Sequence, residues 1–270
     1  MGIVQNLLDK GHTVIATGRK LDKVDNRAIK KACDLFMIAD PFNYFDNPDV
    51  LLHLAWQDGF VHYSPSHIDE LPKHYRFISN FAESEVKMIA CMGSMHEIGF
   101  FEGSIDENTP CHPTTPYGIS KNALRMLTEM QCKKNGKDYQ WLRGFYIVGN
   151  SEYGSSIFSK ITAAEKEGKK EFPFTMGLNQ FDFLDYDIFC EQVSRTVTQS
   201  KVKGIINICS GYPEKLSERV ERFIKDNNYK IKLNYGAFPD RPYDSKAVWG
   251  DGRKITEIML STEEKGCREK

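Results

Sequence analysis

Residues 88–92, Met-Ile-Ala-Cys-Met, form a short apolar run that leads directly into Gly93 and Ser94. A continuous apolar run of this length is typical of a strand that is buried on both faces of a parallel sheet. Ser94 would then lie at the carboxyl end of the strand, the edge where open α/β sheets bind their ligands. This stretch therefore predicts the fold class and the place where a functional site should be sought.

Further strand candidates lie on both sides of this run, and helical stretches separate most of them. Apolar residues recur at helical spacing over residues 3–8, and Gly11 follows as a helix stop. The strand candidates are residues 13–17, 35–38, 50–55, 87–92 and 140–148. This alternation predicts an α/β fold with a doubly wound parallel sheet.

The alternation ends at about residue 150, after which the sequence is irregular and rich in Gly, Phe and Pro. We therefore expect a main domain at residues 1–149 and a smaller region at residues 150–270. The apolar run 205–208 and the helical pattern near 217–226 are expected to return to the main body, so that residues from about 181 to 210 belong with it. The domain boundary is thus predicted to be interleaved.

Tyr117 and Lys121 form a Tyr-x-x-x-Lys pair, and Ser94 lies 23 residues before the tyrosine. Residues four apart share a helix face, at about 5–6 Å between Cβ atoms. An ammonium group so placed is expected to lower the pKa of the phenol from its ordinary value of about 10. With the Ser94 hydroxyl on the same substrate oxygen, the tyrosine would move a proton to or from a carbinol oxygen during hydride transfer.

The pair alone is weak evidence, because two common residues at helical spacing often arise by chance, and a surface Tyr–Lys pair is the alternative. The context favours the functional interpretation. Pro110, Pro113 and Pro116 keep the chain non-helical until just before Tyr117. The helix is therefore expected to begin beside the strand end that carries Ser94.

A series of segments resembles the extended short-chain dehydrogenases/reductases, the NAD(P)-dependent epimerase/dehydratase family of sugar-nucleotide enzymes. Residues 11–19 resemble the family's second strand, and residues 50–56, Val-Leu-Leu-His-Leu-Ala-Trp, resemble its fourth. Residues 93–121 resemble the serine strand end and the E-x-x-P…Y-G-x-S-K block. Residues 141–149 and 181–184 resemble the L-R-x-F-N-x-x-G and R-D-F-I motifs. The resemblance covers nearly all 270 residues and implies a Rossmann-like fold.

The resemblance also implies roles for individual residues. Tyr117 would donate the proton, Lys121 would lower its pKa and bind the nicotinamide ribose, and Ser94 would orient the carbonyl. Leu54 and Ala55, at the end of the fourth-strand segment, would contact the cofactor.

Family members begin with a strand and a G-x-x-G-x-x-G turn that holds the cofactor pyrophosphate. Counting back from Gly11, the last glycine of that turn should fall just before Met1, which places Gly2 inside the helix. The resemblance therefore implies that the first strand and the loop are missing. Either the start is an internal methionine, which we favour, or the natural product is truncated. Weak cofactor binding is expected in both cases.

Arg19 and Lys20 follow the second-strand segment, where NAD-preferring members place an acidic residue. A basic pair suits the 2′-phosphate of NADP. The acidic Asp22 nearby means that NAD is also a possible cofactor. Arg19 and Lys20 can alternatively be ordinary solvated side chains without a cofactor role. The sequence predicts NADP or NAD as the cofactor, with NADP preferred.

The residues after Ser94 bear on the reaction. Dehydratases of the family follow the hydroxyl residue with Asp-Glu, whereas Met95 and His96 stand here, so dehydration is disfavoured. His96 resembles the titratable residue of epimerase–reductases, with an ordinary pKa near 6.5. A loop histidine directed at solvent is the alternative, and Glu97 is expected to be structural.

Substrate contacts are expected from three residues. Tyr146 stands where the family has the Asn of L-R-x-F-N, and Phe181 replaces the Arg of R-D-F-I. Phe174 resembles a residue of the strand that lies against the nucleotide base, where it would either stack or pack in the core. Arg241 resembles an arginine that grips the diphosphate, with a surface salt bridge as the alternative.

Composition agrees with a globular enzyme. The chain is 40% hydrophobic and 27% charged, with a formal net charge of −1, which gives no reason to expect nucleic acid or a membrane as a partner. The seven cysteines are odd in number and lack C-x-x-C spacing, so they indicate reduced thiols of a cytoplasmic protein and no metal site. The sequence leaves it open whether the protein forms a homodimer.

The leading interpretation is an NAD(P)-dependent sugar-nucleotide oxidoreductase, most plausibly a 4-ketoreductase of a nucleoside-diphosphate 6-deoxyhexose in surface-polysaccharide synthesis. A sugar-nucleotide epimerase is the alternative within enzymes. An inactive remnant or an NAD(P)-binding regulatory protein is the alternative outside them.

Overall fold

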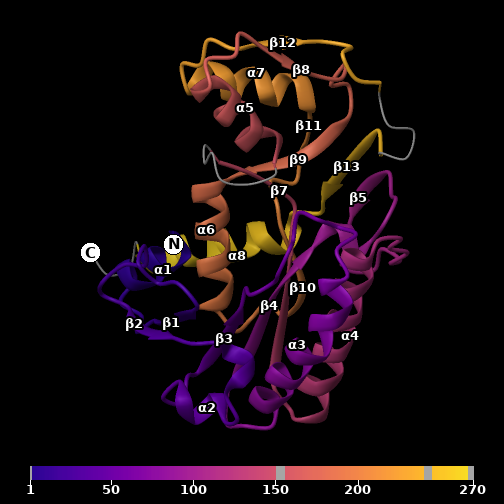
Figure 1. The fold of residues 1–270 in the computed structure, drawn as a ribbon. Coiled ribbons are helices and arrows are strands. Elements are labelled where there is room, and N and C mark those ends of the chain that lie inside the picture. The colour runs from indigo at the N-terminus through magenta and orange to yellow at the C-terminus, as the bar shows by residue number, and fades with distance from the viewer. Residues whose placement is uncertain (1, 150–155, 240–244, 267–270) are drawn as a thin grey trace.

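The computed structural model describes residues 2–149, 156–239 and 245–266. At its centre is a four-stranded parallel sheet (Figure 1). In spatial order its strands are β10 (Gly204–Ile208), β6 (Asp138–Gly144), β4 (Met88–Ser94) and β3 (Val50–His53). The run that predicted a strand buried on both faces is β4, which pairs with β3 on one side and β6 on the other.

A second parallel sheet lies beyond β3 and consists of β1 (Ile15–Gly18) and β2 (Ile29–Ala32). Among the described residues, β1 has no ladder with β3, so the two sheets stay separate. The gap between them is considered below.

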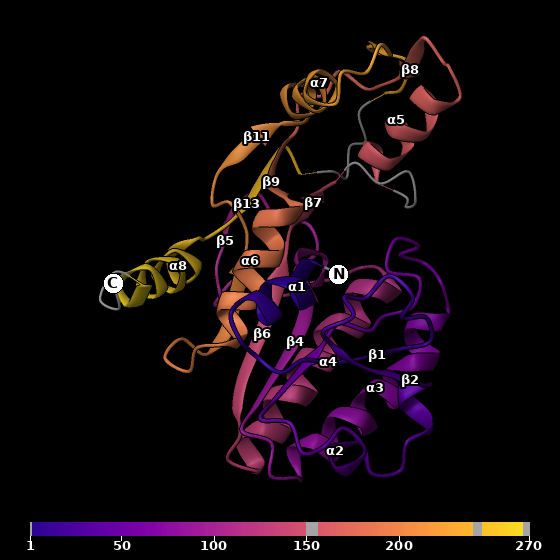
Figure 2. The ribbon, with the colours of Figure 1, turned by 90° about the vertical axis from the view of Figure 1, so that its left-hand side faces the viewer.

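Helices cover both faces of the main sheet (Figure 2). One face carries α3 (Ser66–Ala82) and α4 (Pro116–Lys134), and the other carries α1 (Gly2–Asp9), α6 (Tyr186–Val197) and α8 (Arg253–Gly266). Short helical segments complete this part: η1 (Leu35–Met37), α2 (Pro41–Tyr44) and η2 (Met95–Glu97). Two apolar clusters result, one on each side of the sheet.

A smaller region sits over the carboxyl edge of the main sheet, at the top of Figure 1. Its mixed sheet runs β11 (Pro213–Lys215), β9 (Gln180–Asp185), β13 (Ala247–Gly250) and β5 (Gly103–Ile105), with β7 (Tyr146–Val148) paired to β9. Its other elements are α5 (Ile157–Lys166), α7 (Leu216–Asp226), β8 (Glu171–Pro173) and β12 (Lys232–Asn234).

The predicted α/β fold with parallel sheets is confirmed. The strand expected at 35–38 is wrong, because η1 occupies that stretch. β2 escaped prediction because Ile29–Ala32 reads Ile-Lys-Lys-Ala, a polar and largely exposed edge strand.

In the second half, α6 and β10 lie with the main sheet, whereas β9 belongs to the smaller region's sheet. α7 does not return to the main body, because Val220 and Phe223 pack into the apolar cluster of the smaller region. No helix in the described ranges is long and apolar enough to cross a membrane.

Candidate active site

Ser94 ends β4 and caps the short helix η2. Its side chain accepts a hydrogen bond from the backbone N–H of His96 at 3.3 Å, and the residue is 7% exposed. The preceding Gly93 is required by packing, since a Cβ there would lie 2.1 Å from Nε1 of Trp141. The end of β4 can therefore pack directly against the indole of Trp141, and this contact helps to position Ser94.

A buried ion pair holds this turn in place. The Glu97 carboxylate accepts from Nε of Arg143 at 2.7 Å and from Nε1 of Trp141 at 2.8 Å, and all three side chains are fully buried. Nη1 of Arg143 also donates to the backbone carbonyl oxygen of Asp106, at 2.8 Å. Glu97 thus ties the serine turn to β6, in agreement with the structural role predicted for it.

Tyr117 enters the site at the start of α4. Thr115 caps the helix by accepting from the N–H of Gly118, and Pro116 occupies the first turn, where its missing N–H costs nothing. A Cβ on Gly118 would lie 2.4 Å from the carbonyl oxygen of His96. This close approach brings the helix start against η2, so that Ser94 and Tyr117 meet across it.

Aromatic rings surround the Tyr117 ring. His62 stacks on it with centroids 5.0 Å apart and planes 7° apart. His67, His96 and Trp56 lie at 5.2, 6.1 and 6.2 Å. Burial in this setting raises the pKa of Tyr117, while a hydrogen bond with Ser94 acts in the opposite direction.

The expected lowering of the Tyr117 pKa by Lys121 is therefore wrong for this state of the protein. Lys121 is 4% exposed and turns toward β4, where its Nζ donates to the carbonyl oxygen of Met92 at 2.8 Å. The same Nζ lies 4.0 Å from the centroid of the Trp56 ring, a cation–π contact. Burial lowers the pKa of Lys121 to about 8.

Sequence analysis missed the cluster formed by Trp56 with His53, His67 and His74. Trp56 donates through Nε1 to Nδ1 of His67 at 3.1 Å and stacks on His74 at 4.6 Å. Nε2 of His53 and Nδ1 of His74 are 2.8 Å apart and share a proton whose position depends on the tautomers. The Trp that follows Leu54 and Ala55 was visible in the sequence, but its partners lie on α3.

The buried histidines predict acid sensitivity. Burial, Lys121 and Lys73 lower the pKa of His74 to about 3, whereas an unfolded histidine binds a proton near 6.5. Below pH 6.5 the unfolded chain therefore binds the extra proton, and stability falls with falling pH until the folded pKa is reached. From pH 7 to 5 we expect His74 to account for a loss of about 2 kcal/mol.

Urea unfolding at both pH values measures this loss. His74→Gln should reduce it by about that amount, whereas exposed His12→Gln should leave it unchanged. An equal loss in the parent and in His74→Gln would refute the assignment.

A cavity of about 1830 Å³ runs from the gap between β1 and β3 to the carboxyl ends of both strands. Gly18, Arg19, Leu54 and Ala55 line the cavity, whereas Lys20 is exposed and is not among its lining residues. The cavity does not reach Ser94, Tyr117 or Lys121. Trp56 lines the cavity and covers Lys121, so the indole stands between the cavity and the catalytic candidates.

The described residues fit the two ends of a nicotinamide dinucleotide better than its middle. Arg19 beside Gly18 would suit the adenosine ribose, and Lys121 with Tyr117 would suit the nicotinamide ribose. At the amino end of α1, the N–H of Gly2 donates to Oη of Tyr186 at 3.3 Å, so this N–H is already paired and would have to be released to hold a pyrophosphate.

The residues predicted to contact the substrate do not lie together in the structure. Tyr146 is half-buried, 6.3 Å from His96 and 4.8 Å from Phe181 by ring centroids, so it lies beside the site. Phe174 is 2% exposed and packs edge-on against Tyr235 in an apolar cluster. Of the two roles left open for Phe174, stacking on a base and packing in the core, the structure shows core packing. Arg241 lies outside the described residues.

His96 points into the site and not to solvent, at 4.4 Å from His62 by ring centroids. Burial and His62 lower the pKa of His96 to about 4, so the imidazole is neutral at pH 7. Met95 is buried in the core. Neither position offers a carboxylic acid to the substrate.

Comparisons with known proteins agree with this geometry. The family model for the NAD dependent epimerase/dehydratase family matches residues 2–209. A curated relative, dTDP-6-deoxy-L-talose 4-dehydrogenase (NAD(+)) of Aggregatibacter actinomycetemcomitans, is 42% identical over 254 residues, which cover 92% of this chain and 94% of that protein.

Solved structures show the same fold. UDP-N-acetylglucosamine 4-epimerase from Methanobrevibacter ruminantium, in complex with UDP-N-acetylmuramic acid, gives a TM-score of 0.80 at 18% identity, covering 95% of this chain and 87% of that one. UDP-glucose 4-epimerase from Thermus thermophilus, in complex with NAD, gives 0.79 at 16% identity, covering 97% and 88%.

Proposed function

The chain belongs to the NAD dependent epimerase/dehydratase family, and we propose that it interconverts an alcohol and a ketone at C4 of a nucleoside-diphosphate 6-deoxyhexose. The observation that carries the proposal is the meeting of Ser94 and Tyr117, with Lys121 one turn further along α4, at the carboxyl edge of the sheet. The 42% identical relative supports it, since its name gives the same carbon, sugar class and redox chemistry.

Each residue has a distinct part. Tyr117 gives its phenolic proton to the ketone oxygen in reduction and receives it back in oxidation, while the Ser94 hydroxyl donates to the same oxygen and orients it. The raised pKa keeps the phenol protonated at neutral pH, which suits the reductive direction. The nicotinamide, when bound, supplies or accepts the hydride. Lys121 would hold its ribose and bring positive charge near the phenol, after the ammonium leaves Trp56.

A direct assay tests the proposal. The protein is incubated with dTDP-6-deoxy-L-talose and NAD(+), and NADH is followed by absorbance while the product is identified by mass spectrometry. A 4-keto sugar nucleotide is the expected product. Binding of both ligands without turnover would favour the inactive remnant.

We further propose NAD as the cofactor, in place of the NADP preference that Arg19 and Lys20 predicted. Relatives bind or use NAD, and only Arg19 of the basic pair lines the cavity. We expect kcat/KM to be higher for NAD(+) than for NADP(+). A several-fold advantage of NADP(+) that disappears in Arg19→Ala would restore the sequence-based preference.

Reduction should also outrun dehydration. Water elimination needs an acid and a base beside the ketone. Met95 is core and can supply neither group, so the pair of acids that dehydratases place after the hydroxyl residue is replaced by Met95 and the neutral imidazole of His96. We expect no measurable water loss from a parent hexose nucleotide under conditions where the 4-keto sugar is reduced. Efficient elimination, seen by product mass, would contradict this.

Epimerisation stays a second candidate because His96 lies 6.1 Å from Tyr117 by ring centroids, within the site. Proton exchange beside the ketone in deuterated water distinguishes the two functions. If His96→Asn abolishes exchange and spares reduction, the epimerase function is supported. We also propose a cytoplasmic location, which the nicotinamide chemistry supports.

A further inference from the structure

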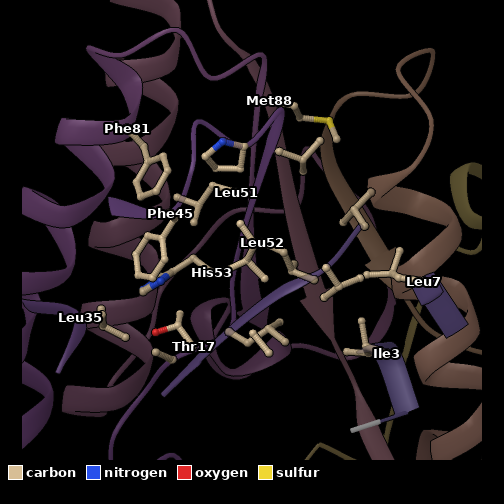
Figure 3. A pocket seen from close by; sticks show the side chains of 18 of the residues that line it. Ile3, Leu7, Thr17, Leu35, Phe45, Leu51, Leu52, His53, Phe81 and Met88 are labelled. Carbon is tan, nitrogen blue, oxygen red and sulfur yellow. The ribbon is translucent and has the colours of Figure 1, made fainter. Parts of the chain in front are cut away.

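Residues 57–64 form a loop between β3 and α3 that contacts Tyr117. Figure 3 shows Leu51, Leu52 and His53 of β3 among the side chains that line the large cavity, and the loop follows this strand. Residues 58–69 are not among the lining residues of the cavity. The 57–64 loop therefore reaches Tyr117 without bordering the cavity.

The side chains of the 57–64 loop are arranged against their hydrophobicity. Phe60, Val61 and Tyr63 are 70%, 56% and 73% exposed, whereas His62 between them is half-buried against the Tyr117 ring. Burial of apolar surface alone would favour the opposite arrangement, because the large apolar side chains gain most from leaving water. The inward position of His62 therefore needs an explanation other than burial.

Tyr117 has no preceding turn of its own helix to pack against. It is the second residue of α4, and long helical side chains lean over the turn on the amino-terminal side of their own Cα. The backbone N–H groups of a first helical turn also have no partner within the helix. Another part of the chain must therefore support the phenol and pair with this N–H.

His62 meets both needs. Its carbonyl oxygen accepts from the backbone N–H of Tyr117 at 3.1 Å, and its imidazole stacks on the phenol with centroids 5.0 Å and planes 7° apart. The rings of His67, His96 and Trp56 meet the phenol at 58°, 64° and 77°. Among the described residues, His62 is thus the one whose ring lies flat on the phenol, which restricts the rotation of the phenol.

Hydrogen bonds anchor the loop that carries His62. The Asp58 carboxylate accepts from the hydroxyl of Ser64 at 2.9 Å. His67 is buried, and its Nε2 donates to the carbonyl oxygen of Val61 at 2.9 Å while its Nδ1 accepts from Nε1 of Trp56 at 3.1 Å. Both bonds of His67 require the same tautomer, so they form together. The imidazole of His62 is therefore presented from an anchored segment.

The His62 imidazole is held by its face and not by its ring nitrogens. Within residues 2–149, 156–239 and 245–266, neither ring nitrogen has a hydrogen-bond partner. Burial and His67 lower the pKa of His62, so the ring is neutral at pH 7. A phenyl ring could replace the imidazole without breaking a hydrogen bond of the protein, which allows stacking and hydrogen bonding to be tested separately.

We propose that His62 is a positioning residue of the reaction, whose ring holds the Tyr117 phenol in place while the phenolic proton moves. The inference rests on the proposed function, because the step that it serves is proton transfer by Tyr117. Misplacement of a reacting group by about 1 Å can cost about 10²-fold in rate. Loss of the stack should therefore lower kcat and leave KM nearly unchanged.

Three substitutions of His62 separate the possible roles. For oxidation of dTDP-6-deoxy-L-talose with NAD(+), we expect His62→Ala to lower kcat about tenfold to a hundredfold. His62→Phe keeps an aromatic face and should restore most of kcat, whereas His62→Asn keeps polar groups without a ring and should not. Tyr63→Ala, in the same loop and 73% exposed, is the control and should match the parent. The urea unfolding midpoint of each variant shows that the fold is retained.

A second measurement does not depend on turnover. Tetranitromethane nitrates exposed tyrosine rings, and mass spectrometry of the peptide that contains Tyr117 gives the rate at this ring. We expect nitration of Tyr117 to be several-fold faster in His62→Ala than in the parent, because one face of the phenol is uncovered, and to be unchanged in His62→Phe. Tyr212, which is 79% exposed, is the internal reference and should react equally in all proteins.

Four results would overturn the proposal. The first is a parent-like kcat in His62→Ala. The second is a kcat in His62→Phe as low as in His62→Ala, which would make the ring nitrogens the acting groups. The third is an equal loss in Tyr63→Ala, which would assign the effect to the loop as a whole. The fourth is equal nitration of Tyr117 in the parent and His62→Ala. If the parent itself does not turn over, the proposed reaction fails and nitration alone decides the role of His62.

Discussion

Tyr117→Phe should lower turnover about 10²–10⁴-fold, the range typical for loss of a general acid–base group. The substitution removes the hydroxyl that bonds with Ser94 inside the aromatic ring cluster. The phenyl ring still stacks on His62, so the fold should persist. kcat and KM are measured for the parent protein and the variant, with reduction of the 4-keto sugar as the reaction.

Tyr44→Phe provides the matched control. Tyr44 lies in α2, and its ring contact with Lys31 does not require the hydroxyl. Its turnover should equal that of the parent. Turnover of Tyr117→Phe within a few-fold of the parent, with an unchanged unfolding midpoint, would remove Tyr117 from the mechanism.

The fold was predictable where local pattern and burial coincide. β4 is apolar over most of its length because it has a strand on both sides and helices on both faces, and a short continuous apolar run is typical of such a strand. β2 was not predicted, since this exposed edge strand contains two lysines and shows no apolar run or alternation of apolar and polar residues. The 35–38 run is apolar because η1 packs beneath α3, not because it is extended.

The places of the candidate residues in the fold were predictable, and their electrostatics were less so. Ser94, Tyr117 and Lys121 are fixed by a strand end and a helix start, which sequence spacing reveals. The direction of the Tyr117 pKa depends on burial and on where the Lys121 ammonium points, and both depend on Trp56 and α3, which are remote in sequence. The sequence spacing of Ser94, Tyr117 and Lys121 does not predict contacts with residues that are this remote in the sequence.

Glu97→Gln should lower the free energy of unfolding by about 3–5 kcal/mol, the cost of breaking a buried ion pair from one side. Arg143 is fully buried, and its charge is balanced by the Glu97 carboxylate at 2.7 Å. A neutral amide still accepts from Trp141 but leaves that charge uncompensated. Urea unfolding at pH 7 measures the loss.

A surface pair provides the comparison. Asp49→Asn breaks the ion pair with Lys87, in which both side chains are more than 70% exposed, and should cost less than about 1 kcal/mol. A double variant, Glu97→Leu with Arg143→Leu, should recover part of the loss, because no unpaired charge then stays buried. A loss below about 1 kcal/mol in Glu97→Gln would mean that Arg143 is balanced elsewhere. Glu97 also accepts from the backbone N–H of Ser94, so the stability of the protein and the position of Ser94 depend on the same carboxylate.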